Sequence, residues 1–468
     1  MTETIRKNLN DHAWARWSAM LLIALMMLFA HMFVDVISPL KELIQVQRGW
    51  TSDVFGTYAG SEYLLNVWGL LIVAGIILDK MGLRFTGELS AIVMFAGACI
   101  KYYAISDAFI GSGLETWLNS WWVAMPASAK LASLGFMIFG CGCEMAGITA
   151  SKAMAKWFEG KEMALAMGLE MALARVGVFF IFTISPRIAG IGGADPSIVR
   201  PVAFCTALLL IGLMCYTIFC LMDKKLDTQL GAAATGEPEE EFKISDIGKI
   251  FSSRLFWIVA MLCVLYYSAI FPFQKFAANM LQSNLGITAT AAADIFRWFP
   301  VGAACITPLL GWYLDRKGKG ATMLILGSLL MIICHTTFAL VLPAVPSKVI
   351  AFSAIIVLGI SFSLVPAALW PSIPKIMDKR YLGSAYSLIF WVQNFGLSGT
   401  PIIIGYALEK SNPGVAEQIA AGVEGATYNY TVPMLLFASL GVLALLFALW
   451  LKADDKRNHY GLEEPNIK

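Results

Sequence analysis

Two charged residues lie inside long apolar runs of this sequence, and their side chains could bind opposite ends of one ligand. Glu144 falls within the apolar run 131–148, and Arg175 falls within the run 164–178. A charge at the centre of a membrane helix costs about 2.5–3.5 kcal/mol on insertion scales, so it needs a partner or a function. An acid and a base on neighbouring helices suit a ligand that carries both an ammonium and a carboxylate. The alternative is a structural ion pair between them.

Small residues surround both charges at the spacing of one or two helical turns. They are Gly140, Gly147 and Ser151 near Glu144, and Gly168 and Ala172 near Arg175. Residues three, four or seven positions apart share one face of a helix. Small side chains on that face either leave space around a charged tip or allow another helix to approach closely.

The composition indicates that membrane helices hold these charges. The chain has 468 residues, of which 58% are hydrophobic and 14% charged, and its mean hydropathy is +0.70. A soluble domain cannot bury that much apolar surface, so we expect an all-α polytopic membrane protein. The net charge of +2 gives no reason to expect nucleic acid as a partner. We expect no disulfide framework and no metal site, because all nine cysteines lie in apolar segments without metal-ligand spacing. We also expect no cofactor.

Apolar stretches long enough to cross a bilayer recur twelve times. They cover residues 14–40, 52–79, 84–106, 127–156, 161–189, 199–222, 254–281, 289–314, 321–342, 347–376, 382–409 and 429–452. The first is too long for a signal-peptide core and lacks a small-residue cleavage site, so we expect it to remain as a helix. Of the 34 Lys and Arg residues, 23 lie on one side if both termini are cytoplasmic, and nine, among them Lys101 and Lys275, lie on the other. The sequence looks prokaryotic, so this bias predicts a multi-pass inner (plasma) membrane protein with both termini in the cytoplasm.

The longest polar stretch divides the chain into two six-helix halves. We expect an N-terminal bundle over residues 1–222, a cytoplasmic linker over 223–253 and a C-terminal bundle over 254–468. The linker contains the acidic segment 231–241, which is typical of a flexible connection. Segment 242–251 follows and could form an amphipathic helix at the membrane interface.

The two halves share a motif at corresponding positions. Residues 75–82 and 311–318 both read G-x-x-x-D-[KR]-x-G, each at the end of the second predicted helix of its half. Parallel halves with internal repeats are typical of transporters. The charged residues in and beside these turns are candidates for gating: Asp79, Arg84, Asp315 and Arg316.

The paired turns and the layout of six plus six helices resemble the major facilitator superfamily over the whole chain. The resemblance implies two pseudo-symmetric six-helix bundles that alternate access to a central site. It also implies that Asp79 and Asp315 tether their loops to basic side chains and helix ends when the cytoplasmic side is closed. An acid at a helix N-terminus is favoured by about 0.3–1 kcal/mol, which can bias a balanced equilibrium.

Several segments are similar to one branch of that superfamily, the lysosomal dipeptide transporters. The similar segments are Glu144 with 157–162, 168–177, 266–273, 368–371, 382–386 and 393–396. This resemblance implies that Glu144 holds the ammonium of a peptide and Arg175 its carboxylate. A two-residue chain spans at most about 7 Å, which two charged tips on adjacent helices can bracket. Helix 1 around 31–35 differs from the pattern, so we transfer no substrate contact there.

The same resemblance marks further candidates on the other bundle. Four aromatic residues could line a central cavity, and two amides could bind the peptide backbone or bond between helices. They are Tyr266, Tyr267, Phe273 and Trp370, with Gln393 and Asn394 as the amides. Aromatic residues beside prolines lie where transporter helices break.

Other polar residues in or near the predicted helices have simpler interpretations. Asp35 and Glu62 are candidate entrance charges or gate partners, and Asp294 with Arg297 fits a local i,i+3 pair. Two histidines, His31 and His335, are candidate proton sites because the pKa of imidazole lies near neutrality, although buried structural histidines are commoner.

We therefore expect a monomeric transporter of dipeptides or similar small zwitterions in a lipid bilayer, with uniport or proton coupling left open. A first alternative is an organic-anion or sugar-phosphate exchanger, in which Arg175 and Arg297 clamp the anion. A second is a non-transporting receptor or scaffold, which would not need two gate motifs. An enzyme is disfavoured, because the sequence shows no nucleophile with its base and no metal-ligand spacing.

Overall fold

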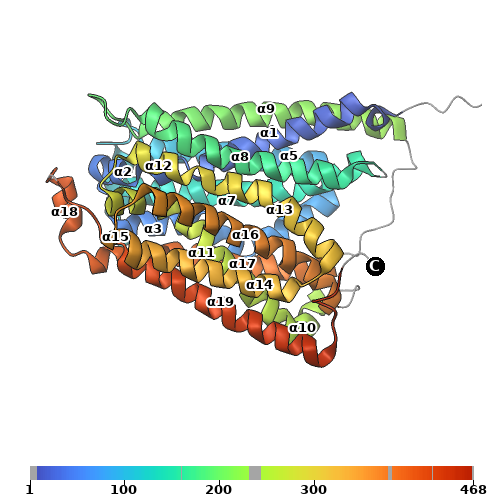
Figure 1. The fold of residues 1–468 in the computed structure, drawn as a ribbon. Coiled ribbons are helices and arrows are strands. Elements are labelled where there is room, and N and C mark those ends of the chain that lie inside the picture. Colours follow the sequence, from blue (N-terminus) through green and yellow to red (C-terminus); the bar gives the residue numbers. More distant parts are fainter. Residues whose placement is uncertain (1–7, 160, 231–243, 378–381, 424, 466–468) are drawn as a thin grey trace, which may run out of the picture.

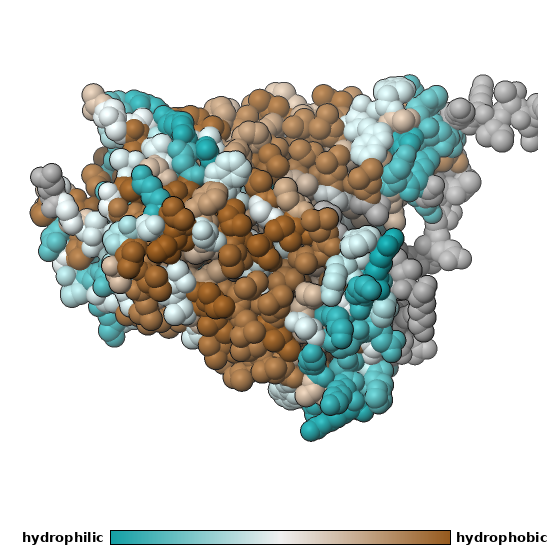
Figure 2. Space-filling view, in the orientation of Figure 1, coloured by the Kyte–Doolittle hydropathy of each residue, from teal (hydrophilic) through white to brown (hydrophobic). Residues whose placement is uncertain are grey.

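The computed structural model describes residues 8–159, 161–230, 244–377, 382–423 and 425–465, and it consists of helices that run side by side (Figure 1). Ten helices among these residues are long and apolar enough to cross a membrane. Figure 2 shows a broad hydrophobic belt on the face in view, with hydrophilic residues gathered toward both ends. A belt of this kind is the surface that a membrane-spanning bundle presents to lipid.

The helices fall into an N-terminal and a C-terminal bundle. The first contains α1 (Ala13–Val34), α3 (Ser52–Ser61), α4 (Leu64–Val67), α5 (Leu70–Ile105), α7 (Ala127–Phe158), α8 (Met163–Ala189) and α9 (Val199–Leu230). The second contains α11 (Arg254–Leu285), α12 (Ala289–Phe296), α13 (Trp298–Lys317), α14 (Gly320–Thr336), α16 (Lys348–Ile376), α17 (Leu382–Ser411) and α19 (Thr431–Asn458). Shorter helices are α2 (Lys41–Arg48), α6 (Gly113–Asn119), α10 (Ile244–Ser252), α15 (Leu342–Ala344) and α18 (Val415–Ala420).

The two ends of the molecule differ in what they carry. We call the end with α10 and the C-terminus the terminal end, and the opposite end, with α2 and α18, the far end (Figure 1). In the orientation predicted from the Lys and Arg residues, the terminal end faces the cytoplasm.

Two of the twelve predicted spans are not single helices. Segment 52–79 is divided among α3, α4 and the start of α5, and α5 continues through Gly82 into the next predicted span. Gly82 has a φ of 79°, a left-handed conformation that glycine adopts easily. Segment 289–314 is divided between α12 and α13. At the last residue of α4, the Val67 carbonyl accepts a hydrogen bond of 2.9 Å from Trp391 Nε1, which satisfies a backbone group freed by the helix break.

The predicted linker is only partly described. Helix α9 continues to Leu230, beyond the expected end of the first bundle at residue 222, and α10 occupies most of the predicted amphipathic segment. The predicted acidic segment lies outside the described residues, which resume at residue 244.

Helices α3 and α17 join the two bundles at the far end through facing glycines. A Cβ atom on Gly56 would lie 2.3 Å from the Pro401 carbonyl oxygen and 3.0 Å from the Cα atom of Gly405. Nearby, the Ser398 hydroxyl donates a hydrogen bond of 3.0 Å to the Gly60 carbonyl. Backbones can approach this closely only where side chains are absent, so the far end is closed in this structure.

At the terminal end, the C-terminal segment 459–465 runs across the loop between α13 and α14. Lys319 and Gly320 donate backbone hydrogen bonds of 3.1 and 3.0 Å to carbonyls of this segment. The Glu463 carboxylate accepts hydrogen bonds from the Thr322 N–H and hydroxyl at 2.7 and 2.8 Å. Glu463 therefore caps the first turn of α14, where N–H groups lack partners within the helix.

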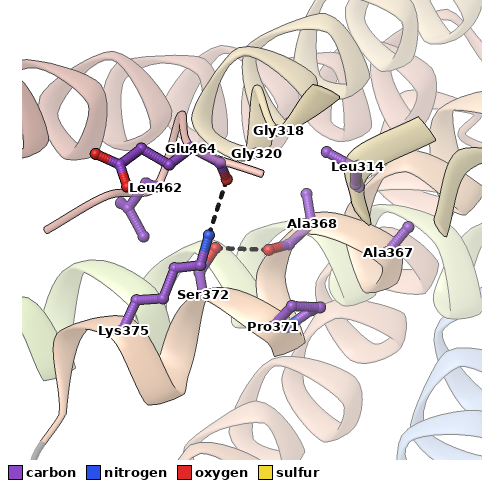
Figure 3. Close-up of a pocket in the computed structure, with 10 residues that line it drawn as sticks. All are labelled: Leu314, Gly318, Gly320, Ala367, Ala368, Pro371, Ser372, Lys375, Leu462 and Glu464. Atoms are coloured by element: carbon purple, nitrogen blue, oxygen red, sulfur yellow. Dashed lines mark hydrogen bonds between the residues drawn. The ribbon is translucent and has the colours of Figure 1, made fainter. Parts of the chain in front are cut away.

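Lys375 on α16 holds the same segment from the other side (Figure 3). Its ammonium group donates to the Glu464 carbonyl at 3.1 Å. It also donates to the Gly461 carbonyl at 2.9 Å. Leu462 is 1% exposed and lines the small pocket beneath the segment, together with Pro371. The segment thus packs as part of the C-terminal bundle.

We predict that Glu463→Ala lowers the stability of the folded protein by about 1–2 kcal/mol, the usual effect of removing a helix cap. Thermal unfolding of the purified protein in detergent would measure the loss. Glu464→Ala is the matched control, because the Glu464 side chain is exposed and only its carbonyl binds Lys375. Equal effects of the two substitutions would contradict the capping role.

Candidate functional site

Glu144 on α7 and Arg175 on α8 lie on adjacent helices, and both side chains are partly buried. No ion pair or hydrogen bond joins the two to each other among the described residues, so the structural pair that the sequence allowed does not form here. Arg175 Nη1 lies 3.4 Å from Thr307 Oγ1 on α13, and the guanidinium lies 5.3 Å from the centre of the Phe362 ring. Arg175 therefore reaches across to the C-terminal bundle.

The small residues around these charges lie in two different packing environments. A Cβ atom on Gly140 would lie 1.8 Å from the Glu62 carbonyl oxygen, so α7 touches the backbone at the end of α3. By contrast, nothing lies within 4 Å of a Cβ atom placed on Gly147 or Gly168. One side of Glu144 is thus tightly packed, while the stretch toward the terminal end borders open space.

An aromatic wall on the C-terminal bundle faces Arg175. We define it as Tyr267, Phe271, Phe362 and Trp370. Trp370 Nε1 donates a hydrogen bond of 3.2 Å to the Tyr267 hydroxyl oxygen, and Tyr267 stacks on Phe271 with ring centres 5.6 Å apart. Phe271 meets Phe362 edge to face at 5.6 Å. The structure therefore brings together Arg175, Tyr267 and Trp370 among the residues singled out from the sequence.

Two of the predicted aromatic residues are placed elsewhere. The Tyr266 hydroxyl bonds to the Leu324 carbonyl and to Ser328 Oγ, both on α14, inside the C-terminal bundle. Phe273 is fully buried and packs against His335 and Phe338, with ring centres 5.0 and 5.4 Å away. Both side chains point into the core of their own bundle, so they are not part of the arrangement around Arg175.

The two predicted amides are also buried. Gln393 Oε1 accepts a contact of 3.0 Å from Cys263 Sγ on α11, which is the interhelical alternative raised by the sequence. Asn394 donates through Nδ2 to the Phe390 carbonyl at 3.0 Å, while its Oδ1 has no partner among the described residues. His335 is fully buried, and its Nε2 lies 3.1 Å from the Ala269 carbonyl, as in a structural histidine.

Four charged residues are buried together near the far end, and only the two acids among them were singled out as candidates from the sequence. Lys275 on α11 lies 3.3 Å from Asp35 and 3.0 Å from Glu62, and the exposed fractions of these residues are 5%, 1% and 4%. Lys101 on α5 is fully buried nearby, and its ammonium lies 4.1 Å from the centre of the Phe33 ring. The charge bias along the sequence assigned Lys101 and Lys275 to outer segments. The structure buries both, because Lys101 packs against aromatic rings and Lys275 contacts the two acids. We call Asp35, Glu62, Lys101 and Lys275 the far-end charge cluster.

The gating candidates lie at the terminal end. Asp79 pairs with Lys152 of α7 at 2.9 Å, and Arg84 pairs with Asp223 of α9 at 3.2 Å. Arg316 places its guanidinium 5.0 Å from the centre of the Trp312 ring, and Asp315 lies beside it on α13. The Asp79 contact is to a basic side chain of the same bundle. The tether that the family resemblance implies for a closed cytoplasmic side stays a prediction. Asp294 and Arg297 form the expected i,i+3 pair at 2.9 Å, and Asp294 also pairs with Arg187 of the other bundle at 2.8 Å.

Comparison with known proteins identifies the relationship. The model of the Major Facilitator Superfamily matches residues 20–401 and 276–466. The chain is 27% identical over 347 residues to the lysosomal dipeptide transporter MFSD1 of Danio rerio, covering 73% of this chain and 69% of that protein. It is 28% identical over 294 residues to the lysosomal dipeptide transporter MFSD1 of Homo sapiens, covering 60% of each.

Solved structures share the fold at low sequence identity. A bacterial homologue of the human lysosomal transporter Spinster, in an inward-facing and occupied conformation, matches with a TM-score of 0.69 at 14% identity, covering 94% of this chain and 97% of that one. The nucleoside transporter NupG matches with a TM-score of 0.66 at 14% identity, covering 93% of this chain and 99% of that one.

Proposed function

Since this chain belongs to the major facilitator superfamily, we propose that it transports dipeptides or similar small zwitterions by alternating access. The observation that carries the proposal is the separation of Glu144 and Arg175, which lie on adjacent helices without pairing with each other. A partly buried acid and a partly buried guanidinium that are not neutralised by one another can each accept a group of opposite charge. The names of the relatives, lysosomal dipeptide transporters, point to the same substrate class.

In this proposal Glu144 binds the ammonium group of the dipeptide and Arg175 binds its carboxylate. Arg175 offers a planar fork of N–H donors that matches the two oxygens of a carboxylate. Its contact with Thr307 is long at 3.4 Å, so a substrate carboxylate can replace it at little cost. The bound substrate would then lie between α7 and α8 on one side and the aromatic wall on the other.

Alternating access follows from how the two bundles meet. The far end is closed by the glycine contact of α3 with α17, and Lys275 and Arg187 add charged contacts between the bundles at the same end. Opening that end would require the bundles to rock apart there and together at the terminal end, where Asp79 and Arg84 lie. We propose an inner-membrane monomer with both termini in the cytoplasm.

The anion-exchanger alternative needs both Arg175 and Arg297 to be available to one anion. Arg297 is instead paired with Asp294, and its guanidinium lies 5.4 Å from the centre of the Phe179 ring. The zwitterion proposal therefore accounts for the observed contacts better. A receptor or scaffold remains distinguishable because it would bind a ligand without moving it across the membrane.

Thermal stabilisation by a panel of dipeptides, with N-acetylated and C-amidated versions of each, tests the proposal. We expect dipeptides with both termini free to raise the unfolding temperature, because binding only the folded state stabilises it by mass action. Blocking either terminus should remove most of the shift. A response to phosphate or dicarboxylates but to no peptide would favour the exchanger, and binding without uptake into proteoliposomes would favour a receptor.

A further inference from the structure

The side-chain amide of Asn66 is buried without a hydrogen-bond partner. Asn66 is fully buried on α4, and neither its Nδ2 nor its Oδ1 has a partner among the described residues. Among the buried amides in the described part of the chain, only this one lacks a partner at both atoms. Leaving a buried amide unpaired is unfavourable, so a group that pairs with it in another state of the protein would stabilise that state.

Asn66 lies at the depth of Glu144. The chain from α3 to the start of α5 runs in the same direction as α7, because Glu62 lies against Gly140 while Asp79 pairs with a lysine of α7 closer to the terminal end. Asn66 follows Glu62 by four residues and Glu144 follows Gly140 by four, an advance of about 6 Å along each helix. Because α4 also packs against α7, this register places Asn66 opposite Glu144.

The position of Tyr63 supports this register. Tyr63 directly precedes α4, and its side chain interacts electrostatically with the carboxylates of both Glu62 and Glu144. Residues three apart are neighbours on a helical surface, so Asn66 lies on the same side of its segment as Tyr63. The acid that Tyr63 and Asn66 meet on α7 is therefore Glu144.

The Glu144 carboxylate has the acceptor atoms that the Asn66 amide lacks. It makes no hydrogen bond or ion pair among the described residues, and its side chain is only partly buried. An ionised carboxylate has two acceptor oxygens, and the Nδ2 atom of asparagine carries two donor hydrogens. Since a carboxylate without fixed partners adopts several orientations, ordering it opposes the binding of a substrate ammonium.

We propose that Asn66 is a positioning residue for the ammonium site. In the substrate-bound state its Nδ2 donates a hydrogen bond to one oxygen of the Glu144 carboxylate, and the other oxygen binds the substrate ammonium. This hydrogen bond fixes the direction of the carboxylate and so strengthens its contact with the ammonium. The inference rests on the proposed function, and it adds the residue that sets the preference for a free amino terminus.

The test is a double-mutant cycle read by the dissociation constants of dipeptides on the purified protein. Asn66→Leu removes both polar atoms, and because the amide is unpaired without substrate, the variant should not be less stable than the wild type. We expect it to bind a dipeptide with free termini about tenfold more weakly. Binding of the N-acetylated form should not change, because that form has no ammonium for Glu144 to bind.

The same substitution in two other backgrounds separates positioning from a general structural role. In Glu144→Gln, which has no carboxylate to hold, Asn66→Leu should change the affinity by less than about twofold. In Arg175→Lys, where the altered residue binds the opposite end of the substrate, the loss of about tenfold should persist. A structural role for Asn66 would weaken the free and N-acetylated forms alike and would add to the effect of Glu144→Gln.

Ser133→Ala is the matched control. The Ser133 hydroxyl is also buried on α7 without a partner among the described residues, about three turns before Glu144, so its removal should leave dipeptide binding unchanged. Additive effects with Glu144→Gln, or unchanged dipeptide binding by Asn66→Leu, would overturn the inference. Asn66→Ser, whose hydroxyl is too short to reach the carboxylate, should give the same loss and serves if Asn66→Leu does not fold. Absence of dipeptide binding by the wild type would instead contradict the proposed function.

Discussion

Replacing Glu144 by Gln is expected to reduce dipeptide uptake at least tenfold, the largest effect of any conservative substitution in this protein. The amide keeps the shape of the side chain but removes the negative charge that would bind the substrate ammonium. A hydrogen bond to a charged group contributes about 1.5–3 kcal/mol, which corresponds to a loss of roughly 10- to 100-fold in binding. Uptake of labelled dipeptide into proteoliposomes, with binding followed by thermal stabilisation, would measure it.

Arg175→Lys should weaken uptake for a different reason. Lysine keeps the positive charge but loses the planar fork, so bidentate binding of a carboxylate is lost. C-amidated peptides, which lack that carboxylate, should bind the wild type and this variant equally weakly. N-acetylated peptides should likewise fail to distinguish Glu144→Gln from the wild type.

The control for Glu144→Gln is Glu88→Gln. Glu88 lies on α5, whereas Glu144 and Arg175 lie on α7 and α8. Its carboxylate accepts a hydrogen bond of 2.7 Å from the Thr217 hydroxyl, and the amide of the variant can retain that bond. Full dipeptide uptake by correctly folded Glu144→Gln protein would overturn the assignment of the ammonium site.

Gly405→Val is expected to block transport by preventing closure of the far end. A Cβ atom at position 405 would lie 2.3 Å from the Ser52 carbonyl oxygen and 2.9 Å from the Cα atom of Gly56. Both neighbours are backbone atoms, which cannot rotate away as a side chain can. The bundles must therefore separate at this end, and a transporter that cannot close one end cannot alternate.

Distances between spin labels placed at the far ends of α3 and α17 would report the separation directly. Gly399→Val on the same helix is the control, because nothing lies within 4 Å of a Cβ atom at that position. We expect Gly405→Val to lengthen the distance and abolish uptake, and Gly399→Val to leave both close to wild type. Normal uptake by Gly405→Val would show that the two helices never approach this closely during transport.

Much of the architecture is encoded locally and could be predicted. Apolar length predicts membrane helices, because each backbone polar group in lipid must be satisfied within its own segment. The repeated motifs at Asp79 and Asp315 and the polar linker predict two similar halves. The breaks after α4 and between α12 and α13 were missed. At the first of them the freed Val67 carbonyl is satisfied by Trp391, a partner distant in the sequence.

The far-end charge cluster shows a second limit of prediction from the sequence. Asp35 and Glu62 were recognised as possible gate partners, but Lys101 and Lys275 were counted as outer charges because they lie close to helix ends. A lysine near a helix end usually extends its ammonium to the membrane surface. Only the packing of α11 against the first bundle brings Lys275 to the two acids.

The sequence by itself determined that Glu144 and Arg175 are charges within membrane helices, and that the chain forms two six-helix halves. It did not determine which side of each helix faces the centre. Tyr266 and Tyr267 are adjacent on α11, yet Tyr267 meets the aromatic wall and Tyr266 bonds to α14 inside the bundle. Lipid and protein interior are both apolar, so a membrane helix lacks the one-sided hydrophobic pattern that orients a helix in water. The direction of each side chain is therefore decided by the packing of neighbouring helices, which only the tertiary structure contains.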